Sequence, residues 1–368
     1  MTETKGQLGF GMMRLPSKNG IIDIEATKKL VDRFMDAGLN YFDTAWAYPG
    51  SEEAVRKALV ERYPRESYVL ATKMAAWRSK SREEMEEQFE KSLKDSGVEY
   101  FDNYLLHNLG EDRTEFFDRY DGWSFVRGLK EKGLVKHIGF SFHDRAPVLR
   151  KILEKHPEME FVQLQVNYAD WNNPAIQSKE CIEVAKEFGI PVIVMEPLRG
   201  GMLANPPDKV KEIFDAYSEK RTYASWALRF AAGCDNVRTV LSGMNSMEQM
   251  DDNISSLDGF KGMSEKEMKV IEKASETLAS IPIIPCTSCD YCAKVCPKDI
   301  GISGTFVSDN IITLYGNKEF AMSQLFWLVD LHKRKRADNC IGCGACEKVC
   351  PQHIKIVDLL KVCNSRLQ

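Results

Sequence analysis

The sequence predicts an α/β protein, a (β/α)8 barrel of the TIM type followed by a small α+β domain. From Gly6 to Leu278, short β-rich runs alternate with amphipathic helical stretches. Eight strand–helix repeats in about 270 residues match the size of a TIM barrel. A doubly wound sheet is the alternative, but Gly9-Phe10-Gly11 is followed by Met12 and no third glycine opens a helix, so the dinucleotide fingerprint is absent. Nine of the eleven cysteines lie in the last 83 residues, so we expect the tail to differ in kind from the barrel.

The predicted elements follow one another in strand–helix order. The strands are expected over residues 8–11, 40–43, 68–72, 102–106, 136–141, 161–166, 191–195 and 238–241. The helices are expected over residues 25–37, 52–63, 82–96, 124–132, 145–154, 177–188, 222–232 and 247–257. A last helix over 264–280 opens with Ser264 and Glu267 in the spacing of a capping box. The prolines at 282 and 285 then break the helical period, so we place the barrel at 1–280 and the second domain at 281–368, with a helical insert over 303–337.

Composition and charge exclude several classes of function. Hydrophobic residues make up 43% of the chain and charged residues 28%, as in an ordinary folded protein. The net charge of -4 gives no global attraction to nucleic acid or to an anionic membrane. The N-terminus lacks the apolar core of a signal peptide, and no apolar run approaches the roughly 20 residues that span a bilayer. We therefore expect a cytoplasmic protein that acts on a small molecule and binds neither nucleic acid nor membrane.

The cysteines of the tail form two runs of identical spacing. Each reads Cys-x2-Cys-x2-Cys-x3-Cys-Pro, the first beginning at Cys286 and the second at Cys340. In this pattern three cysteines hold one 4Fe-4S cluster and the fourth, before proline, holds the other cluster. The expected ligands are Cys286, Cys289, Cys292 and Cys350 for one cluster, and Cys340, Cys343, Cys346 and Cys296 for the second. Structural zinc is the alternative, but it more often takes two separated Cys-x2-Cys pairs, and disulfides are uncommon without a signal peptide.

The tail resembles the bacterial two-cluster ferredoxins, lengthened by an insert between the cysteine runs. Apolar residues from Lys318 to Lys335 stand at near-helical spacing, which favours a packed helix over a docking surface. The basic run His332–Arg336 is most simply a solvated face, with the alternative that it attracts an acidic electron carrier such as a ferredoxin or flavodoxin. We interpret Cys181, Cys234 and Cys363 as ordinary thiols.

Four polar residues fall where the second, third and fourth predicted strands end. They are Asp43, Tyr48, Lys73 and His107. Each alone is unremarkable, but together they suit the reduction of a carbonyl, which needs a proton donor for its developing alkoxide. A tyrosine can donate if its pKa, ordinarily about 10, is lowered by a neighbouring ammonium. Asp43 would hold Lys73, and His107 would orient the carbonyl oxygen.

These residues and the Phe-Asp-Thr-Ala-x-x-Tyr motif resemble the aldo-keto reductase family over residues 6 to 260. The resemblance implies an extended nicotinamide cofactor, NADP or NAD, bound without a Rossmann fold. Ser141 and Gln165 match the residues that hold the nicotinamide carboxamide. The other positions that match cofactor contacts are Met195, Pro197, Leu198, Ser242, Gly243, Asn245, Gln249 and Asn253.

Three positions depart from the family pattern. Phe142 replaces the asparagine common after the serine, Met195 replaces an aromatic that stacks on nicotinamide, and Ser246 stands where a basic residue meets the 2'-phosphate. Three functions therefore stay open. The first is a reductase of aldehydes or ketones that uses NAD(P)H. The second is an electron-transfer enzyme in which a flavin couples two-electron chemistry to the one-electron clusters. The third is a non-catalytic binding or regulatory barrel.

Overall fold

The computed structural model describes residues 4–111, 113–174, 176–286, 288, 290–350 and 353–368. The chain divides into two compact units: Met1–Arg199 with Arg221–Ile271, and Gly200–Lys220 with Glu272–Gln368. This grouping divides helix α11 (Glu265–Ser280) between the units. The boundary between residues 280 and 281 stays a prediction. No helix in the described ranges has the length and apolar character needed to cross a membrane.

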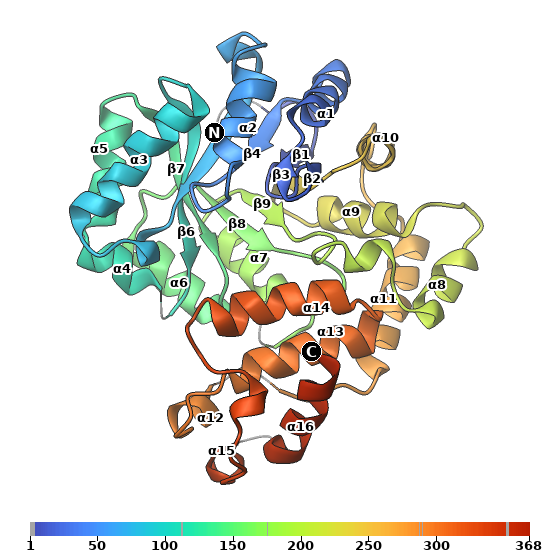
Figure 1. The fold of residues 1–368 in the computed structure, drawn as a ribbon. Helices are drawn as coiled ribbons and strands as arrows, with labels where there is room; N and C mark the ends of the chain where they lie inside the picture. The colour runs from blue at the N-terminus through green and yellow to red at the C-terminus, as the bar shows by residue number, and fades with distance from the viewer. Residues whose placement is uncertain (1–3, 112, 175, 287, 289, 351–352) are drawn as a thin grey trace. The chain divides into compact units, whose positions relative to one another are not determined.

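Eight parallel strands close into a barrel in the first unit, which confirms the predicted fold class (Figure 1). The strands are β1 (Leu8–Gly11), β4 (Tyr41–Asp43), β5 (Val69–Met74), β6 (Phe101–Leu109), β7 (Val135–Phe142), β8 (Phe161–Gln165), β9 (Val192–Met195) and β10 (Val237–Ser242). Each strand pairs with its neighbours along the chain, and β1 closes the barrel by pairing with both β4 and β10. Because all the strands are parallel, their carboxyl ends meet at one rim of the barrel.

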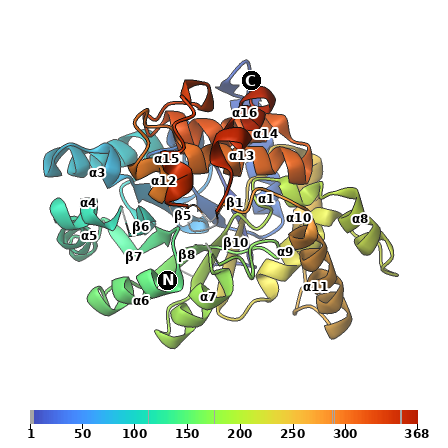
Figure 2. The same cartoon turned by 90° about the horizontal axis from the view of Figure 1, so that it is seen from below.

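Helices lie outside the strands, as Figure 2 shows for α3, α6 and α7. They are α1 (Ile24–Asp36), α2 (Ser51–Val55), α3 (Arg82–Ser96), α5 (Gly122–Glu131), α6 (Ala146–Lys155), α7 (Ser178–Glu187), α9 (Tyr223–Gly233) and α10 (Met247–Leu257). Short 3-10 turns, η2 (Arg65–Ser67), η3 (Ala76–Arg78) and η4 (Met202–Ala204), join some of these elements. Side-chain caps explain several helix starts: Asp23, Ser81, Thr222 and Ser246 each accept a hydrogen bond from a first-turn N–H. The Ser264–Glu267 capping box also forms, with Ser264 accepting from the Glu267 N–H.

Some elements differ from the sequence-based expectation. The segment predicted as one helix over 52–63 is α2 followed by a π-helical turn, η1 (Arg56–Val60). Helices α4 (Thr114–Arg119) and α8 (Asp208–Asp215) and the hairpin β2 (Ser17–Lys18) with β3 (Ile21–Ile22) were not predicted. These elements are short, so few residues can repeat a period in them.

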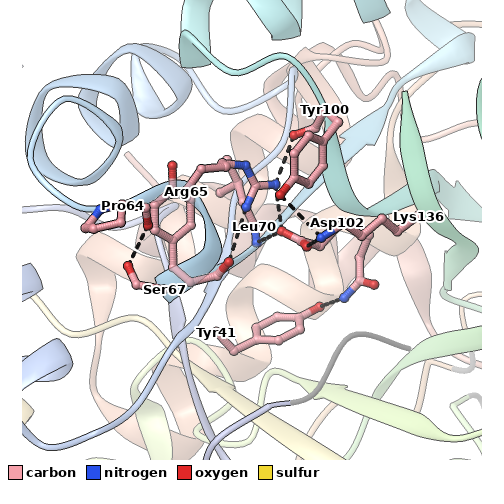
Figure 3. Close-up of polar contacts among 10 residues, drawn as sticks. Tyr41, Pro64, Arg65, Ser67, Leu70, Tyr100, Asp102 and Lys136 are labelled. Atoms are coloured by element: carbon pink, nitrogen blue, oxygen red, sulfur yellow. Dashed lines mark hydrogen bonds and ion pairs between the residues drawn. The ribbon is translucent and has the colours of Figure 1, made fainter. Parts of the chain in front are cut away.

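A polar network ties together the amino-terminal ends of three strands (Figure 3). Asp102, 1% exposed at the start of β6, accepts hydrogen bonds from Arg65 Nη2 at 2.7 Å, Leu70 N at 2.9 Å and Lys136 Nζ at 2.9 Å. The guanidinium carbon of Arg65 also lies 3.9 Å from the centroid of the Tyr100 ring. The network is remote from the rim where the strands end, so its role is to stabilise the barrel.

We expect Asp102→Asn to lower the free energy of unfolding by about 2–4 kcal/mol, because two cations lose a shared buried counter-charge. Urea denaturation measures this loss. The matched control is Asp235→Asn, which breaks the exposed pair with Lys186 and should lower the free energy of unfolding much less than Asp102→Asn, because exposed ion pairs contribute little to stability. Equal losses in the two variants would show that the network does not stabilise the barrel.

The second unit is mainly helical around its own apolar core. Its elements are α8 and part of α11, then α12 (Tyr291–Lys294), α13 (Ile302–Tyr315), α14 (Lys318–Leu325), η5 (Phe326–Asp330), η6 (Ala337–Asn339), α15 (Ala345–Lys348) and α16 (Ile356–Arg366). Ile302, Phe306, Leu325 and Leu360 lie in the core, together with Met202. Gly200 packs closely on α14: its φ of 68° is one that L side chains rarely adopt, and an added Cβ would lie 2.3 Å from Cζ of Phe320. The insert is helical up to Asp330 and not over the predicted stretch to Lys335.

Candidate active site and cysteine-lined cavity

The residues singled out from the sequence lie at the carboxyl ends of the barrel strands. Asp43 is the last residue of β4, Lys73 the second-last of β5, and His107 the third-last of β6. Ser141, Gln165, Met195 and Ser242 are at the ends of β7 to β10. The closed parallel sheet therefore brings these side chains to one rim, the position of active sites in TIM barrels.

A buried ion pair forms the base of this site. Lys73 is 0% exposed and Asp43 4%. Lys73 Nζ donates to Asp43 Oδ1 and, at 2.8 Å, to the carbonyl oxygen of Thr44. Gln163, in β8, donates from Nε2 to Asp43 Oδ2 at 3.0 Å. Both carboxylate oxygens are thus satisfied, as a buried charge requires.

Tyr48 lies above this pair, on the turn between β4 and α2. Its N–H bonds the Ala45 carbonyl at 2.9 Å, and Ser51 N–H bonds the Tyr48 carbonyl at 3.1 Å. Lys73 Nζ is 5.0 Å from the centroid of the half-buried Tyr48 ring. Burial raises the pKa of Tyr48 above its ordinary value, while Lys73 acts to lower it. The effect of Lys73 has the expected sign, but the expectation of a lowered pKa is wrong, because desolvation outweighs the ammonium.

His107 completes the group beside Tyr48. The two ring centroids are 5.8 Å apart and the rings meet edge to face, while Trp77 contacts His107 from another side at 5.1 Å. A shift of register between Leu106 and Leu109 bends β6 here, and Asn108 adopts a left-handed φ of 64°. Within the described residues, His107 Nδ1 is buried without a hydrogen-bond partner. A polar atom left in this way is suited to bind a substrate or cofactor atom.

We expect His107 to stay neutral across the physiological pH range. Burial, reinforced by the positive charge of Lys73, lowers its pKa well below the ordinary value of 6.5. A group with a lowered pKa gains its proton only at correspondingly lower pH, so the imidazole remains uncharged near neutrality. NMR of the Cε1 proton should therefore show no titration of His107 between about pH 6 and pH 8. A midpoint near 6.5, absent from a His107→Gln spectrum, would contradict this environment.

The next two strand ends carry donors and acceptors that fit an amide group. The Ser141 hydroxyl accepts from the Asn108 N–H at 2.7 Å and so keeps its proton for another acceptor. Gln165 Nε2 donates to Asp170 Oδ2 at 2.8 Å, which leaves the Gln165 carbonyl oxygen as an acceptor. Asp170 is 0% exposed and also accepts from Asn167 at 2.9 Å. Ser141 and Gln165 thus fit a nicotinamide carboxamide, and Asp170 fixes the orientation of Gln165.

The loop after β10 is organised around the start of α10. Asn253 Nδ2 donates to Ser242 Oγ at 2.8 Å, and Gln249 Oε1 accepts from Asn245 N at 2.9 Å. Gly243, between them, is next to Arg14, whose Cβ would lie 3.7 Å from an added Cβ. Ser242, Gly243 and Asn245 therefore lead into the N-terminus of α10 and Gln249 lies in its first turn, where helix geometry favours anionic groups such as phosphates, while Asn253 lies further along the helix. Ser246 caps α10 by accepting from the Gln249 N–H at 3.3 Å.

The chain after β9 has an unusual backbone. Met195, partly exposed, ends the strand, and Glu196 and Arg199 have positive φ of 56° and 46°. The Arg199 guanidinium is 3.3 Å from Asp170 Oδ1, and Arg14 is 3.7 Å from Glu196. Strained residues held by ion pairs are typical of ligand-binding loops. Pro197 is buried and Leu198 partly exposed in this turn.

Several contributors to this site were not singled out from the sequence. Gln163 was not singled out, although it precedes Gln165 by two positions and strand alternation places both side chains on one face of β8, so this signal could have identified it. Asp170, Arg199 and Arg14 lie in loops, where no periodicity signals their partners. The ring of Trp77 contacts His107, whereas the ring of Trp171 packs on Phe230, with ring centroids 5.2 Å apart. Phe142 is 1% exposed and meets Phe140 edge to face, so its side chain belongs to the packed core.

The second unit contains a cavity lined by four cysteines, Cys296, Cys340, Cys343 and Cys346. Three come from the second run and one, Cys296, is the fourth cysteine of the first run. Apolar side chains such as Ile300, Ile302 and Leu360 complete the lining. Thiolates in a largely apolar cavity suit an iron–sulfur cluster.

The two cysteine runs have matching backbone conformations. Ser288 and Asp290 in the first run have φ of 54° and 57°, and Gly342 and Gly344 in the second both have 69°. Each run continues into a four-residue helix, α12 or α15, and these two helices contact each other (Figure 1). Cys286, Cys292 and Cys350 belong to or pack on the core of this unit. Cys289 lies outside the described residues. Cys363, which belongs to neither run, is buried beside Asp309 and Arg366.

Known proteins resemble both parts of the chain. The model of the aldo/keto reductase family matches residues 7–276, and the model of a 4Fe-4S dicluster domain matches residues 269–354. An aldo-keto reductase from Mycolicibacterium vanbaalenii is 31% identical over 239 residues, which cover 64% of this chain and 79% of that protein. An uncharacterized oxidoreductase, C215.11c, from Schizosaccharomyces pombe is 26% identical over 67% of this chain and 80% of its own.

Solved structures resemble the barrel. The holo form of aldo-keto reductase AKR11C1 from Bacillus halodurans has a TM-score of 0.61 and 24% identity, and covers 74% of this chain and 96% of its own. An aldo-keto reductase from Klebsiella pneumoniae in complex with NADPH has a TM-score of 0.57 and 20% identity, covering 73% and 90%. At these identities the likeness concerns the fold. Since the family model spans residues 7–276 and the Mycolicibacterium relative is 31% identical over 79% of its length, the chain belongs to the aldo/keto reductase family, as an oxidoreductase with an added 4Fe-4S domain.

Proposed function

We propose that the barrel reduces the carbonyl of a small aldehyde or ketone with a hydride from NADPH or NADH, with Tyr48 as the proton donor. The observation that carries this proposal is the convergence of Tyr48, Lys73, Asp43 and His107 at one end of the barrel. The nicotinamide ring would supply the hydride when bound. The remaining chemistry belongs to side chains of this chain.

Tyr48 and His107 would act directly on the substrate oxygen. Because the pKa of Tyr48 is raised by burial, the phenol stays protonated at neutral pH, which is the form that a proton donor needs. The neutral His107, with its pKa lowered by burial, can donate an N–H hydrogen bond to the same oxygen without competing as an acid. The oxygen would thus be bound by two donors as its negative charge develops.

Lys73 would stabilise the phenolate that remains after the proton has left. Its ammonium is fixed by Asp43 and the Thr44 carbonyl, so no reorganisation is needed when negative charge appears on the Tyr48 oxygen. Asp43 keeps Lys73 charged at a site where burial alone would favour the neutral amine. Gln163 is a positioning residue for Asp43.

The cofactor contacts follow from the donors at the strand ends. Ser141 and Gln165 would bind the carboxamide, and the loop of Ser242, Gly243, Asn245, Gln249 and Asn253 would bind the phosphates and adenosine. Met195, Pro197 and Leu198 would line the ring. Ser246 caps α10 and offers no positive charge to a 2'-phosphate. This position therefore favours NADH, which lacks that phosphate. The Klebsiella structure is a complex with NADPH, so both NADPH and NADH need to be tested.

We propose two 4Fe-4S clusters, each held by three cysteines of one run and by the fourth cysteine of the other run. We assign Cys340, Cys343, Cys346 and Cys296 to the cluster in the described cavity. The matching backbone of the first run supports a second cluster held by Cys286, Cys289, Cys292 and Cys350.

The function is tested with protein purified anaerobically. Iron, sulfide, flavin and nicotinamide are measured in one sample, and the reduction of 4-nitrobenzaldehyde by NADPH and by NADH is followed separately. We expect about eight irons per chain, no flavin, and aldehyde reduction with at least one nicotinamide. Flavin at one per chain together with no reduction by either nucleotide would contradict the proposal.

Crossed ligation makes a specific prediction for Cys296→Ser. Because Cys296 lines the cavity of the second run, its loss should deplete the cluster held by Cys340, Cys343 and Cys346 and leave the first-run cluster. Iron should fall from about eight to about four per chain. Cys363→Ser is the matched control and should keep all the iron. Electron paramagnetic resonance of the reduced protein distinguishes which cluster remains.

An electron-transfer enzyme with a flavin is the second candidate. The aliphatic Met195 in place of an aromatic and the absence of a cation at Ser246 favour it. In that case the clusters would exchange single electrons with the flavin. A ferredoxin or flavodoxin would be the partner of the clusters.

A further inference from the structure

The basic run His332–Arg336 lies next to the cysteine-lined cavity. The helical part of the insert ends at Asp330, and Lys333 turns the chain with a left-handed φ of 57°. Lys335 then pairs with Ile300 in a parallel bridge, with Gly301 N bonding Lys335 O at 3.0 Å and Lys335 N bonding Asp299 O at 2.9 Å. The run is mostly exposed, as the sequence predicted, and it is an extended segment fixed by backbone hydrogen bonds to the chain that follows Cys296.

The cations of this segment are only partly neutralised. Arg336 forms two bonds with Asp330, at 3.0 and 2.5 Å, and Arg334 is 3.6 Å from Asp299. Lys333 and Lys335 are exposed and form no ion pair within the described ranges. The same holds for Lys298, which lines the cavity together with the cysteines. Residues 282–368 carry 11 basic and 8 acidic residues, whereas the whole chain has a net charge of -4.

An exposed apolar side chain, Ile341, lines the same cavity as Lys298. Ile341 lines the cavity between Cys340 and Cys343 and is 60% exposed, and Cys343 is itself exposed. Exposed lysines without ion pairs, together with the exposed Ile341 side chain, are typical of a protein–protein interface, in which an apolar contact is surrounded by polar and charged residues. A nucleic acid would instead need a longer row of cations to neutralise successive phosphates.

We propose that the surface of Lys298, Lys333, Lys335 and Ile341, here called the lysine face, docks an acidic one-electron carrier protein. The inference rests on the proposed cluster at Cys296, Cys340, Cys343 and Cys346, and does not depend on the reaction in the barrel. One electron passes between the carrier and the cluster, so that one is oxidised as the other is reduced, and no bond is made or broken. Carboxylates around the cofactor of the carrier meet the lysines, which orients the two redox groups toward each other.

The test measures binding of an acidic flavodoxin, and separately of an acidic plant-type ferredoxin, to the immobilised anaerobic holoprotein. The variant Lys298→Glu/Lys333→Glu/Lys335→Glu should weaken binding of at least one carrier by about tenfold or more. The control Lys94→Glu/Lys179→Glu/Lys269→Glu makes the same charge change on exposed lysines of other surfaces and should change affinity less than about twofold. Raising the salt from about 25 to about 300 mM should weaken binding to the wild type and have less effect on the charge-reversed variant.

Iron and sulfide are measured in every sample. Equal weakening by both triple variants, no binding of either carrier to protein that contains its clusters, or tighter binding of a short DNA duplex would each overturn the proposal. The variant Lys298→Gln/Lys333→Gln/Lys335→Gln is included in case charge reversal costs a cluster, and it should also weaken binding. Wild-type protein that lacks iron would instead refute the cluster assignment, which separates the two failures.

Discussion

Replacing Tyr48 with phenylalanine should lower kcat for aldehyde reduction by about 100- to 10,000-fold, the usual contribution of a positioned proton donor. The phenylalanine ring keeps the contact with His107 but removes the hydroxyl beside Lys73. The affinity for NADPH should change little, because no proposed cofactor contact is lost. Steady-state kinetics and fluorescence titration with the nucleotide measure the two effects separately.

Tyr63→Phe is the matched control for this variant. The Tyr63 hydroxyl bonds Asp32 at 2.6 Å, away from the strand ends. Its loss should cost about 1 kcal/mol of stability and leave kcat unchanged. A Tyr48→Phe enzyme as active as the wild type would refute Tyr48 as the proton donor and favour the flavin enzyme.

Replacing Lys73 with methionine should damage both folding and catalysis. The change leaves the Asp43 carboxylate, 4% exposed, with Gln163 but without its cation. Breaking a buried pair in this way costs about 3–5 kcal/mol. The rate should fall by about 100-fold or more, since no ammonium remains to stabilise the Tyr48 phenolate.

The double variant Asp43→Asn/Lys73→Met separates the two effects. It removes both charges and keeps a side chain that can accept from Gln163, so most of the lost stability should return. Activity should not return. If the double variant recovered its rate along with its stability, the ion pair would be structural only.

The sequence was sufficient for the barrel because its signals are repeated. Eight alternations of β-rich and amphipathic segments, each strand buried on both sides, leave few other folds. The bounds of α3 and α10 were predicted to the residue, since Ser81 and Ser246 cap them and Gly97 follows α3. The hairpin of β2 and β3 has two residues in each strand, too few for any pattern.

The residue types at the strand ends were predictable from the sequence, but the direction of the net pKa shift of Tyr48 was not. Parallel strands bring Asp43, Lys73 and His107 together once the barrel is known. The sign of the net shift in the Tyr48 pKa depends on how much water reaches the phenol, and burial is a property of the folded chain. Asp170, the counter-charge for Arg199 and the acceptor for Gln165, lies in a loop whose path no local pattern specifies.

The basic run shows the same limit in the second unit. The charges of the run are evident in the sequence, but the spacing of apolar residues from Lys318 onward predicted that the helix continues to Lys335. The chain instead turns at Lys333, because Lys335 gains backbone hydrogen bonds with residues 299 and 301. Contacts between residues about 35 positions apart in sequence decide the structure there, and only folding supplies them.

The most direct test of the account follows a single hydrogen atom. Wild-type enzyme, containing its clusters and kept anaerobic, is given 4-nitrobenzaldehyde and the nicotinamide that supports reduction, labelled with deuterium at C4 on one face at a time. The account predicts that one of the two labelled cofactors transfers its deuterium to the carbinol carbon of the alcohol, as mass spectrometry detects, and that Tyr48→Phe nearly abolishes the product. Alcohol that contains no deuterium with either cofactor would show that the hydride does not pass directly to the carbonyl, and would contradict the proposed function.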